Sequence, residues 1–210
     1  MNKEEKEMIY EINRVRSNPR SYLQYINPLL EKAEKTLKEN GKGTKNYSLS
    51  FTTTTISGKS RQEIDTTWHY INEEEVKALR TLRDDLTKLK SLSVLLPDSG
   101  IYRAAKKHEA DQHKHDWSLM HTGSDGSGPW DRITKFSPSM SFGNENIAAR
   151  SGSPTPREIV IQLLVDSGIP GYGHRYNLLD PQWTHGACTG EKYKDFMYWW
   201  IQNFGVKKKK

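Results

Sequence analysis

The sequence predicts an α+β fold with an antiparallel sheet, because helical patterns come first along the chain and strand patterns come late. Residues 3–16 carry apolar side chains at steps of three and four, which is typical of an amphipathic helix. Residues 155–165 are apolar nearly all round, which favours a buried helix. Residues 183–206 contain a run of tryptophan, tyrosine and isoleucine that suits two half-buried strands.

Residues that typically begin or end helices predict the remaining elements. Pro19 predicts the beginning of a second helix, and an apolar stripe over 73–91 predicts a third. Pro97–Ser99 opens a helix that extends to about Trp117, whereas the glycine-rich residues 122–143 are expected to be mostly loop. The helix over 155–165 begins with a capping box, and Gly168 is expected to end it.

The length of 210 residues is enough for one sizeable domain, and we expect a single domain over 1–210. Its core is expected to comprise about 3–26 and 91–205. Residues 28–90 are expected to be an insertion packed on that core, since 39–67 are rich in turn residues and poor in aliphatic ones. Tyr47, Leu49 and Phe51 alternate with polar residues there, which indicates a short strand or hairpin.

Composition excludes several classes of function. The net charge is +6, of which the basic tail Lys207–Lys210 supplies +4, so the rest of the chain carries only +2. This balance, without a basic stripe between aromatic residues, argues against a nucleic-acid partner. No apolar run is long enough to span a membrane, and the first residues do not form a signal peptide. Cys188 is the single cysteine, which rules out an internal disulfide, and it is expected to be a small buried residue.

One helix carries a candidate metal cluster. His108, Asp111 and His115 are spaced by three and four residues, so they share one face of the helix, and two imidazoles with a carboxylate can bind a divalent ion. The alternative is that His108 packs in the core while the other two side chains meet solvent. The second interpretation is favoured, because local spacing alone is a weak signal.

Three further polar residues lie at junctions between loops and regular elements. His121, Glu145 and His174 are each flanked by small residues that leave the backbone and side chain accessible. A carboxylate followed by Asn and then apolar residues indicates a strand that enters the core. Nothing in the spacing alone brings the three side chains together.

Four segments that contain these residues resemble the CAP superfamily, which includes cysteine-rich secretory proteins, venom allergens and plant pathogenesis-related proteins. They are residues 105–111, 121–126, 143–148 and 174–179. The stretch 164–175 is similar to the bacterial secreted branch in particular, and the lack of cysteine pairs also fits that branch. The resemblance covers about 91–205 and the opening 3–26, and it leaves 28–90 outside.

The resemblance implies an α-β-α sandwich, in which a central antiparallel sheet lies between helical layers. It also implies a cleft lined by two histidines and two acidic residues. His121, Glu145 and His174 match three of these positions and are the expected metal ligands. The fourth position falls at Asp166 or Ser167, with Ser167 closer in register. Asn144 stands where the family usually has glycine before the glutamate.

Two functions follow from the resemblance. The first is a ligand- or partner-binding module outside the cytoplasm, either secreted, periplasmic or at the cell surface, for a small ligand, lipid, glycan or protein. The second is a metal-dependent peptidase or esterase that uses zinc, with Glu145 or Asp166 as the catalytic base. The binding module is favoured. Its expected ligand-binding residues are Asp166, Ser167, Tyr172 and Asn146.

Overall fold

The computed structural model describes residues 1–56, 59–117, 121–193 and 196–209. Its helices and strands, in chain order, are α1 (Lys3–Ser17), the 3₁₀ helix η1 (Pro19–Tyr22), α2 (Leu23–Asn40), β1 (Lys45–Ile56), β2 (Lys59–Tyr70), α3 (Ile71–Lys88), β3 (Leu96–Pro97), α4 (Ser99–Lys114), α5 (Pro129–Phe136), β4 (Met140–Ser151), α6 (Pro156–Val165), the 3₁₀ helix η2 (Pro170–Tyr172), α7 (Gly173–Leu179), β5 (His185–Tyr193) and β6 (Met197–Lys207).

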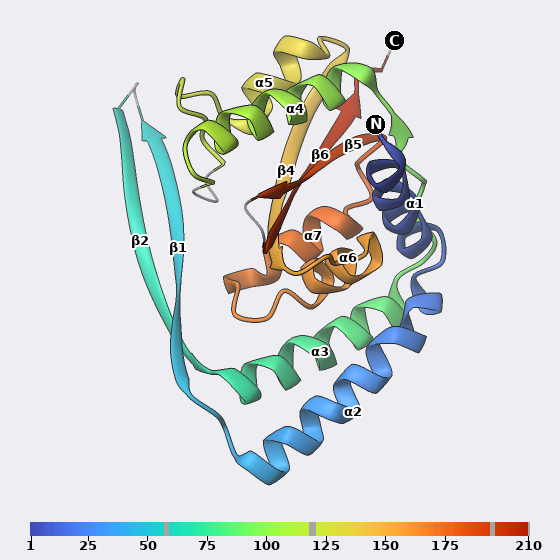
Figure 1. Ribbon diagram of the computed structural model, residues 1–210, viewed down its shortest axis with the longest axis vertical. Helices are drawn as coiled ribbons and strands as arrows, with labels where there is room; N and C mark the ends of the chain where they lie inside the picture. Colours follow the sequence, from blue (N-terminus) through green and yellow to red (C-terminus); the bar gives the residue numbers. More distant parts are fainter. Residues whose placement is uncertain (57–58, 118–120, 194–195, 210) are drawn as a thin grey trace. The chain divides into compact units, whose positions relative to one another are not determined.

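The chain forms two compact units. The first comprises Met1–Pro19, Lys90–Leu163 and Tyr176–Lys210, and the second comprises Arg20–Leu89 and Leu164–Arg175. The first unit contains a four-stranded sheet, and the second contains a two-stranded hairpin with helices α2 and α3 (Figure 1).

The sheet of the first unit has the strand order β3-β5-β6-β4. Strand β6 pairs antiparallel with β4 on one side and with β5 on the other, while β3 adds a short parallel pairing at the edge. The late strand pattern in the sequence is therefore confirmed as the two central strands of a mainly antiparallel sheet.

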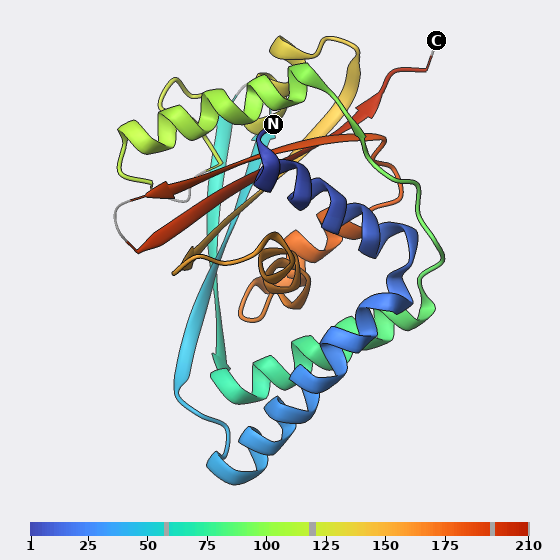
Figure 2. The ribbon, with the colours of Figure 1, turned by 45° about the vertical axis from the view of Figure 1, so that its right-hand side comes forward.

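Helices cover both faces of this sheet (Figure 2). Ile201 of β6 packs with Ala105 of α4, in a buried cluster that also includes stacked Trp117 and Trp199. The next residue, Gln202, points to the opposite face, where its amide contacts the sulfur of Met8 in α1. Because α4 and α1 thus lie on opposite sides, the predicted α-β-α sandwich is confirmed.

In the second unit, α2 and α3 pack side by side, and the β1–β2 hairpin continues from their ends (Figure 1). The two strands pair antiparallel along their length, from Lys45 opposite Tyr70 to Ile56 opposite Lys59. This is the hairpin that the alternation at Tyr47 and Leu49 indicated. Helix α2 runs without a break through Pro28, so the expected start of the insertion falls inside a helix.

Two details of the sequence interpretation are wrong. The stretch 122–143, expected to be mostly loop, contains helix α5, which begins at Pro129 after the Gly128 amide donates to Asp131 at 2.9 Å. Helix α6 ends at Val165 rather than at Gly168, because Asp166 already adopts a left-handed backbone with φ of 54°. None of the described helices is long and apolar enough to cross a membrane.

Candidate functional site

Glu145 of β4 is the centre of a buried polar cluster in the first unit. Its side chain has no exposed surface, and its Oε1 lies 3.1 Å from His121 Nδ1. The His121 side chain, by contrast, is 48% exposed. His108 of α4 lies on the other side of the carboxylate, with its Nε2 3.7 Å from Oε1. Two of the three junction residues, His121 and Glu145, are therefore in contact.

Arg132 of α5 compensates the charge of this buried carboxylate. Its Nη2 donates to Glu145 Oε2 at 3.0 Å and to Oε1 at 3.2 Å, and the arginine side chain is itself only 1% exposed. The same guanidinium donates to the carbonyl oxygens of His121 and Ser127. Arg132 thus binds the carboxylate and the loop that carries His121 at the same time.

The residues around Glu145 explain how β4 is held at this point. A Cβ atom on Gly143 would lie 2.7 Å from both Ile133 Cδ1 and the carbonyl oxygen of Phe204, so glycine permits the close approach of α5. Asn144, at the position where the resemblance implies glycine, donates to Asn177 at 3.0 Å. This contact connects β4 with the part of α7 that belongs to the first unit.

Asn146, expected to contact a ligand, is instead part of the core. Its side chain is fully buried, and it accepts a hydrogen bond from Asn177 Nδ2 at 2.8 Å and donates to Gln202 Oε1 at 3.3 Å. Both ends of the amide are therefore used by the protein, and Asn146 is better described as a structural residue.

The third junction residue, His174, belongs to the second unit, where it pairs with Asp166. His174 Nδ1 lies 2.7 Å from Asp166 Oδ1, and the His174 backbone amide donates to Oδ2 at 2.9 Å. Asp166 is only 4% exposed. Of the two candidates for the fourth acidic position, Asp166 is the one that contacts a histidine, and the neighbouring Ser167 is exposed.

Tyr172 and Arg175 fix this segment to α3 within the second unit. The Tyr172 hydroxyl donates to Glu74 at 3.0 Å, and the Arg175 guanidinium stacks 4.2 Å from the Tyr172 ring centroid. Arg175 is 1% exposed and donates to the carbonyl oxygens of Ala78, Leu164 and Val165. Tyr172 therefore has a packing role in addition to any contact with a ligand.

The helical cluster of His108, Asp111 and His115 does not come together as a set of three, since His115 Nε2 lies 3.7 Å from Asp111 Oδ1 while His108 contacts Glu145. Asp111 accepts hydrogen bonds from the amide and hydroxyl of Ser124, so it caps the loop after α4. Partial burial raises the pKa of Asp111, but the hydrogen bonds from Ser124 together with the charges of His115 and His108 outweigh it, so the pKa is lowered. His108 is buried against Glu145 and Gln112. The favoured interpretation, in which only His108 enters the core, agrees with this arrangement.

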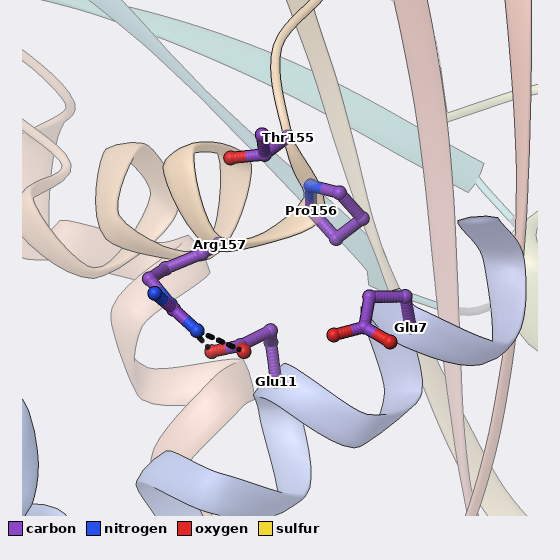
Figure 3. A pocket seen from close by; sticks show the side chains of 5 residues that line it. All are labelled: Glu7, Glu11, Thr155, Pro156 and Arg157. Atoms are coloured by element: carbon purple, nitrogen blue, oxygen red, sulfur yellow. Dashed lines mark hydrogen bonds and ion pairs between the residues drawn. The ribbon is translucent and has the colours of Figure 1, made fainter.

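A pocket of about 260 Å³ lies elsewhere in the first unit, between α1 and the beginning of α6 (Figure 3). Thr155, Pro156 and Arg157 form one wall, and Glu7 and Glu11 form the other. Arg157 donates to both oxygens of Glu11 across it, at 2.9 and 3.2 Å. None of the expected site residues lines this pocket.

Sequence reasoning missed the buried arginines. Besides Arg132 and Arg175, Arg16 of α1 is fully buried and donates to the carbonyl oxygens of Ser93, Leu178, Asp180 and Trp183. Burial lowers the pKa of Arg16 to about 10, against the opposing charge of Asp180. The sequence did carry a signal that Arg16 is buried, because this arginine directly follows Val15 of the apolar stripe.

Sequence reasoning also missed the buried carboxylate of Glu109. Glu109 of α4 is 3% exposed and contacts the Thr189 hydroxyl and Lys106. Burial raises the pKa of Glu109, and the hydrogen bonds from Lys106 and Thr189 oppose this effect only in part. The folded protein therefore binds this proton more tightly than the unfolded chain does.

This pKa predicts a dependence of stability on pH. The contribution of Glu109 to the free energy of unfolding is greatest below the ordinary glutamate pKa of 4.5, and it falls as pH rises from there through the raised value. We expect Glu109→Gln to make the decline in stability as pH rises above 4.5 less steep. Urea unfolding at a series of pH values measures this, with the exposed Glu75→Gln as control. Equal slopes for wild type and Glu109→Gln would contradict the assignment.

Comparison with known proteins identifies the class to which this fold belongs. The model of the cysteine-rich secretory protein (CAP) family matches residues 12–204. The chain therefore belongs to the CAP family, and the resemblance of the four sequence segments is confirmed. A search of curated proteins finds no significant match.

Two solved bacterial structures are similar to the chain. An outer surface protein of Borrelia burgdorferi is 24% identical, with a TM-score of 0.47, over 65% of this chain and 95% of that one. An extracellular protein of Bacillus anthracis that contains an SCP domain is 17% identical, with a TM-score of 0.43, over 83% of this chain and 71% of that one.

Glu145, one of the expected metal ligands, is engaged within the protein. Both oxygens of Glu145 accept hydrogen bonds from Arg132, inside the protein, so this carboxylate is not presented as a ligand. In the described ranges of the chain, no group of three or more His, Cys, Asp or Glu side chains is placed to hold a metal ion. The carboxylates instead contact the Nδ1 atoms of the histidines, and a contact of this kind fixes the orientation of an imidazole ring.

Proposed function

We propose that this CAP domain is a ligand- or partner-binding module that acts outside the cytoplasm, and that His121 is the polar group that meets the ligand. The extracytoplasmic location is suggested by family membership and by the names of the two similar bacterial proteins. The observation that carries the proposal is the contrast between a half-exposed His121 and a completely buried Glu145.

The contact with Glu145 defines which part of His121 meets a ligand. Because a carboxylate only accepts hydrogen bonds, it favours the tautomer of His121 that is protonated at Nδ1. Nε2 is then the nitrogen that can accept a hydrogen bond from a ligand or bind a metal such as zinc. Glu145 is in this account a positioning residue.

A hydrolase is the competing function, and the two carboxylates disfavour it. A general base must be within hydrogen-bond reach of the proton that it removes, directly or through one water. Glu145 is shielded by Arg132 and His121, and both oxygens of Asp166 accept hydrogen bonds from His174. Neither candidate base is presented to a substrate in this arrangement.

Zinc is a suitable probe of the exposed imidazole. Calorimetric titration is expected to give a heat of binding that His121→Ala reduces by more than His113→Ala does. His113 is a matched control, since it also contacts a carboxylate through Nδ1, at 3.1 Å from Glu191, and is 53% exposed. His174→Ala is titrated separately, because this histidine belongs to the second unit.

The same samples decide between binding and hydrolysis. We expect no cleavage of casein or of a p-nitrophenyl ester above the buffer rate, with or without zinc. Cleavage that a chelator abolishes and that Glu145→Gln removes would refute the binding module and support the hydrolase. A zinc heat that is the same in wild type and His121→Ala would remove His121 from the proposed site.

A further inference from the structure

The β1–β2 hairpin of the second unit has two chemically different faces. In the hairpin, Lys45 lies opposite Tyr70, Tyr47 opposite Trp68 and Leu49 opposite Thr66. Side chains of directly opposite residues lie on the same face of the two strands. These six residues form what we call the aromatic face. Among them, Tyr47 is 53% exposed, Leu49 is 44%, Trp68 is 59% and Tyr70 is 37%.

The opposite face of the hairpin contacts the rest of the second unit at Ser48 and His69. Ser48 donates to the carbonyl oxygen of Gly168, and a Cβ atom on Gly168 would lie 3.4 Å from His69 Nε2. Ser48 and His69 are accordingly half-buried. The hairpin is thus fixed by its polar face and presents its aromatic face to solvent.

Cations lie directly on the exposed rings. Lys45 Nζ is 5.2 Å from the centroid of Trp68, and Lys42 Nζ is 5.5 Å from that of Tyr70. Tyr47 and Trp68 are in ring contact, with centroids 5.3 Å apart. Glu73 forms an ion pair with Lys42 at 3.1 Å. Tryptophan, tyrosine and lysine are therefore concentrated on one side of the hairpin.

We propose that the aromatic face binds the surface of an anionic lipid bilayer. Tryptophan and tyrosine combine an apolar body with a polar tip, and they concentrate where a bilayer changes from headgroups to acyl chains. Lysine extends its methylene stem along apolar surface while its ammonium group reaches the anionic headgroups. The composition and charge of the aromatic face match this environment.

The size of the face favours a bilayer over a second copy of the chain. A buried aromatic side chain covers roughly 150–250 Å², so three rings that are about half exposed offer roughly 300 Å². A stable protein interface requires about 800 Å² from each partner. A bilayer needs no complementary partner of that size, because binding grows with the apolar area inserted and the charge attracted.

The test uses the full chain and large unilamellar vesicles of phosphatidylcholine, with or without phosphatidylglycerol. Trp68 is the most exposed of the six tryptophans, and four others are at most 7% exposed. The fluorescence emission should therefore shift to the blue when Trp68 enters the bilayer. We expect co-sedimentation with the anionic vesicles and much weaker binding to the neutral ones.

Substitutions test whether the aromatic face is responsible for vesicle binding. Trp68→Ser should remove the blue shift and weaken binding by about tenfold or more. Lys45→Glu, which changes charge without removing a ring, should weaken binding to anionic vesicles only. Tyr10→Ser is the matched control, because Tyr10 is 56% exposed on α1 and also lies under a cation, Arg14. Tyr10→Ser should bind as wild type does, and circular dichroism should show that all variants are folded.

Three results would overturn the proposal. The first is the absence of wild-type binding to the anionic vesicles. The second is an equal loss of binding in Tyr10→Ser and Trp68→Ser. The third is a dimer that forms without lipid and that Trp68→Ser dissociates, measured by light scattering, which would assign the aromatic face to a second copy of the chain.

Discussion

Replacing Arg132 with methionine is expected to lower the free energy of unfolding by about 3–5 kcal/mol, which is the usual effect of removing one partner of a buried ion pair. The variant leaves the Glu145 carboxylate in the interior without its compensating charge. It also removes the donors to the carbonyl oxygens of Ser127 and His121. Urea unfolding followed by near-ultraviolet circular dichroism measures the change.

Arg150→Met is the matched control for this prediction. Arg150 is 43% exposed and lies 4.0 Å from Glu158, so its ion pair is at the surface. Exposed pairs contribute less than about 1 kcal/mol. If Arg132→Met were no more destabilising than Arg150→Met, the buried pair would not hold the cluster together.

Arg175→Met is expected to have the second large effect, a loss of about 3–5 kcal/mol in the stability of the second unit. The substitution leaves three carbonyl oxygens without this donor, those of Ala78 and Leu164 in buried contacts and that of Val165 in a partly buried one. It also removes the hydrogen bond to the Thr81 hydroxyl at 2.9 Å. Because these contacts join the segment 164–175 to α3, the segment should become accessible to proteases.

Limited proteolysis with identification of the cleavage sites tests this prediction. Arg83→Met is a suitable control, since Arg83 is on the same helix, is 44% exposed and pairs only with its neighbour Asp84 among the ion pairs described. New cleavage within residues 164–175 of Arg175→Met alone is the expected result. Identical cleavage patterns for the two variants would show that Arg175 does not hold the segment.

The sequence predicted the elements whose signals are local. The capping box at Thr155 forms as expected, with the Thr155 amide donating to Glu158 at 2.7 Å, and the strands after residue 183 become the central strands of the sheet. Local spacing also placed His108 in the core. In these cases the neighbouring residues are enough to specify the local structure, and the tertiary contacts are compatible with it.

The roles of the site residues could not be predicted in the same way. His121 and Glu145 are 24 residues apart, and Arg132 comes from a helix in a stretch that looks like a loop. Whether a carboxylate is a ligand, a base or a buried anchor depends on which cation lies beside it. Asn146 shows the same limitation, since its amide is used by Asn177 and Gln202 from distant parts of the chain.

The central claim is that Glu145 is committed to Arg132 and His121, and the most direct test is a double-mutant cycle on the free energy of unfolding. We expect Glu145→Gln to lose about 2–4 kcal/mol, because it leaves the buried Arg132 charge uncompensated. We expect the double variant with Arg132→Met to be more stable than the sum of the single losses predicts, with a coupling of about 2 kcal/mol. A Glu145→Gln variant as stable as wild type, or more stable, would contradict the account, because it would mean that the carboxylate is kept for binding or catalysis at the expense of stability.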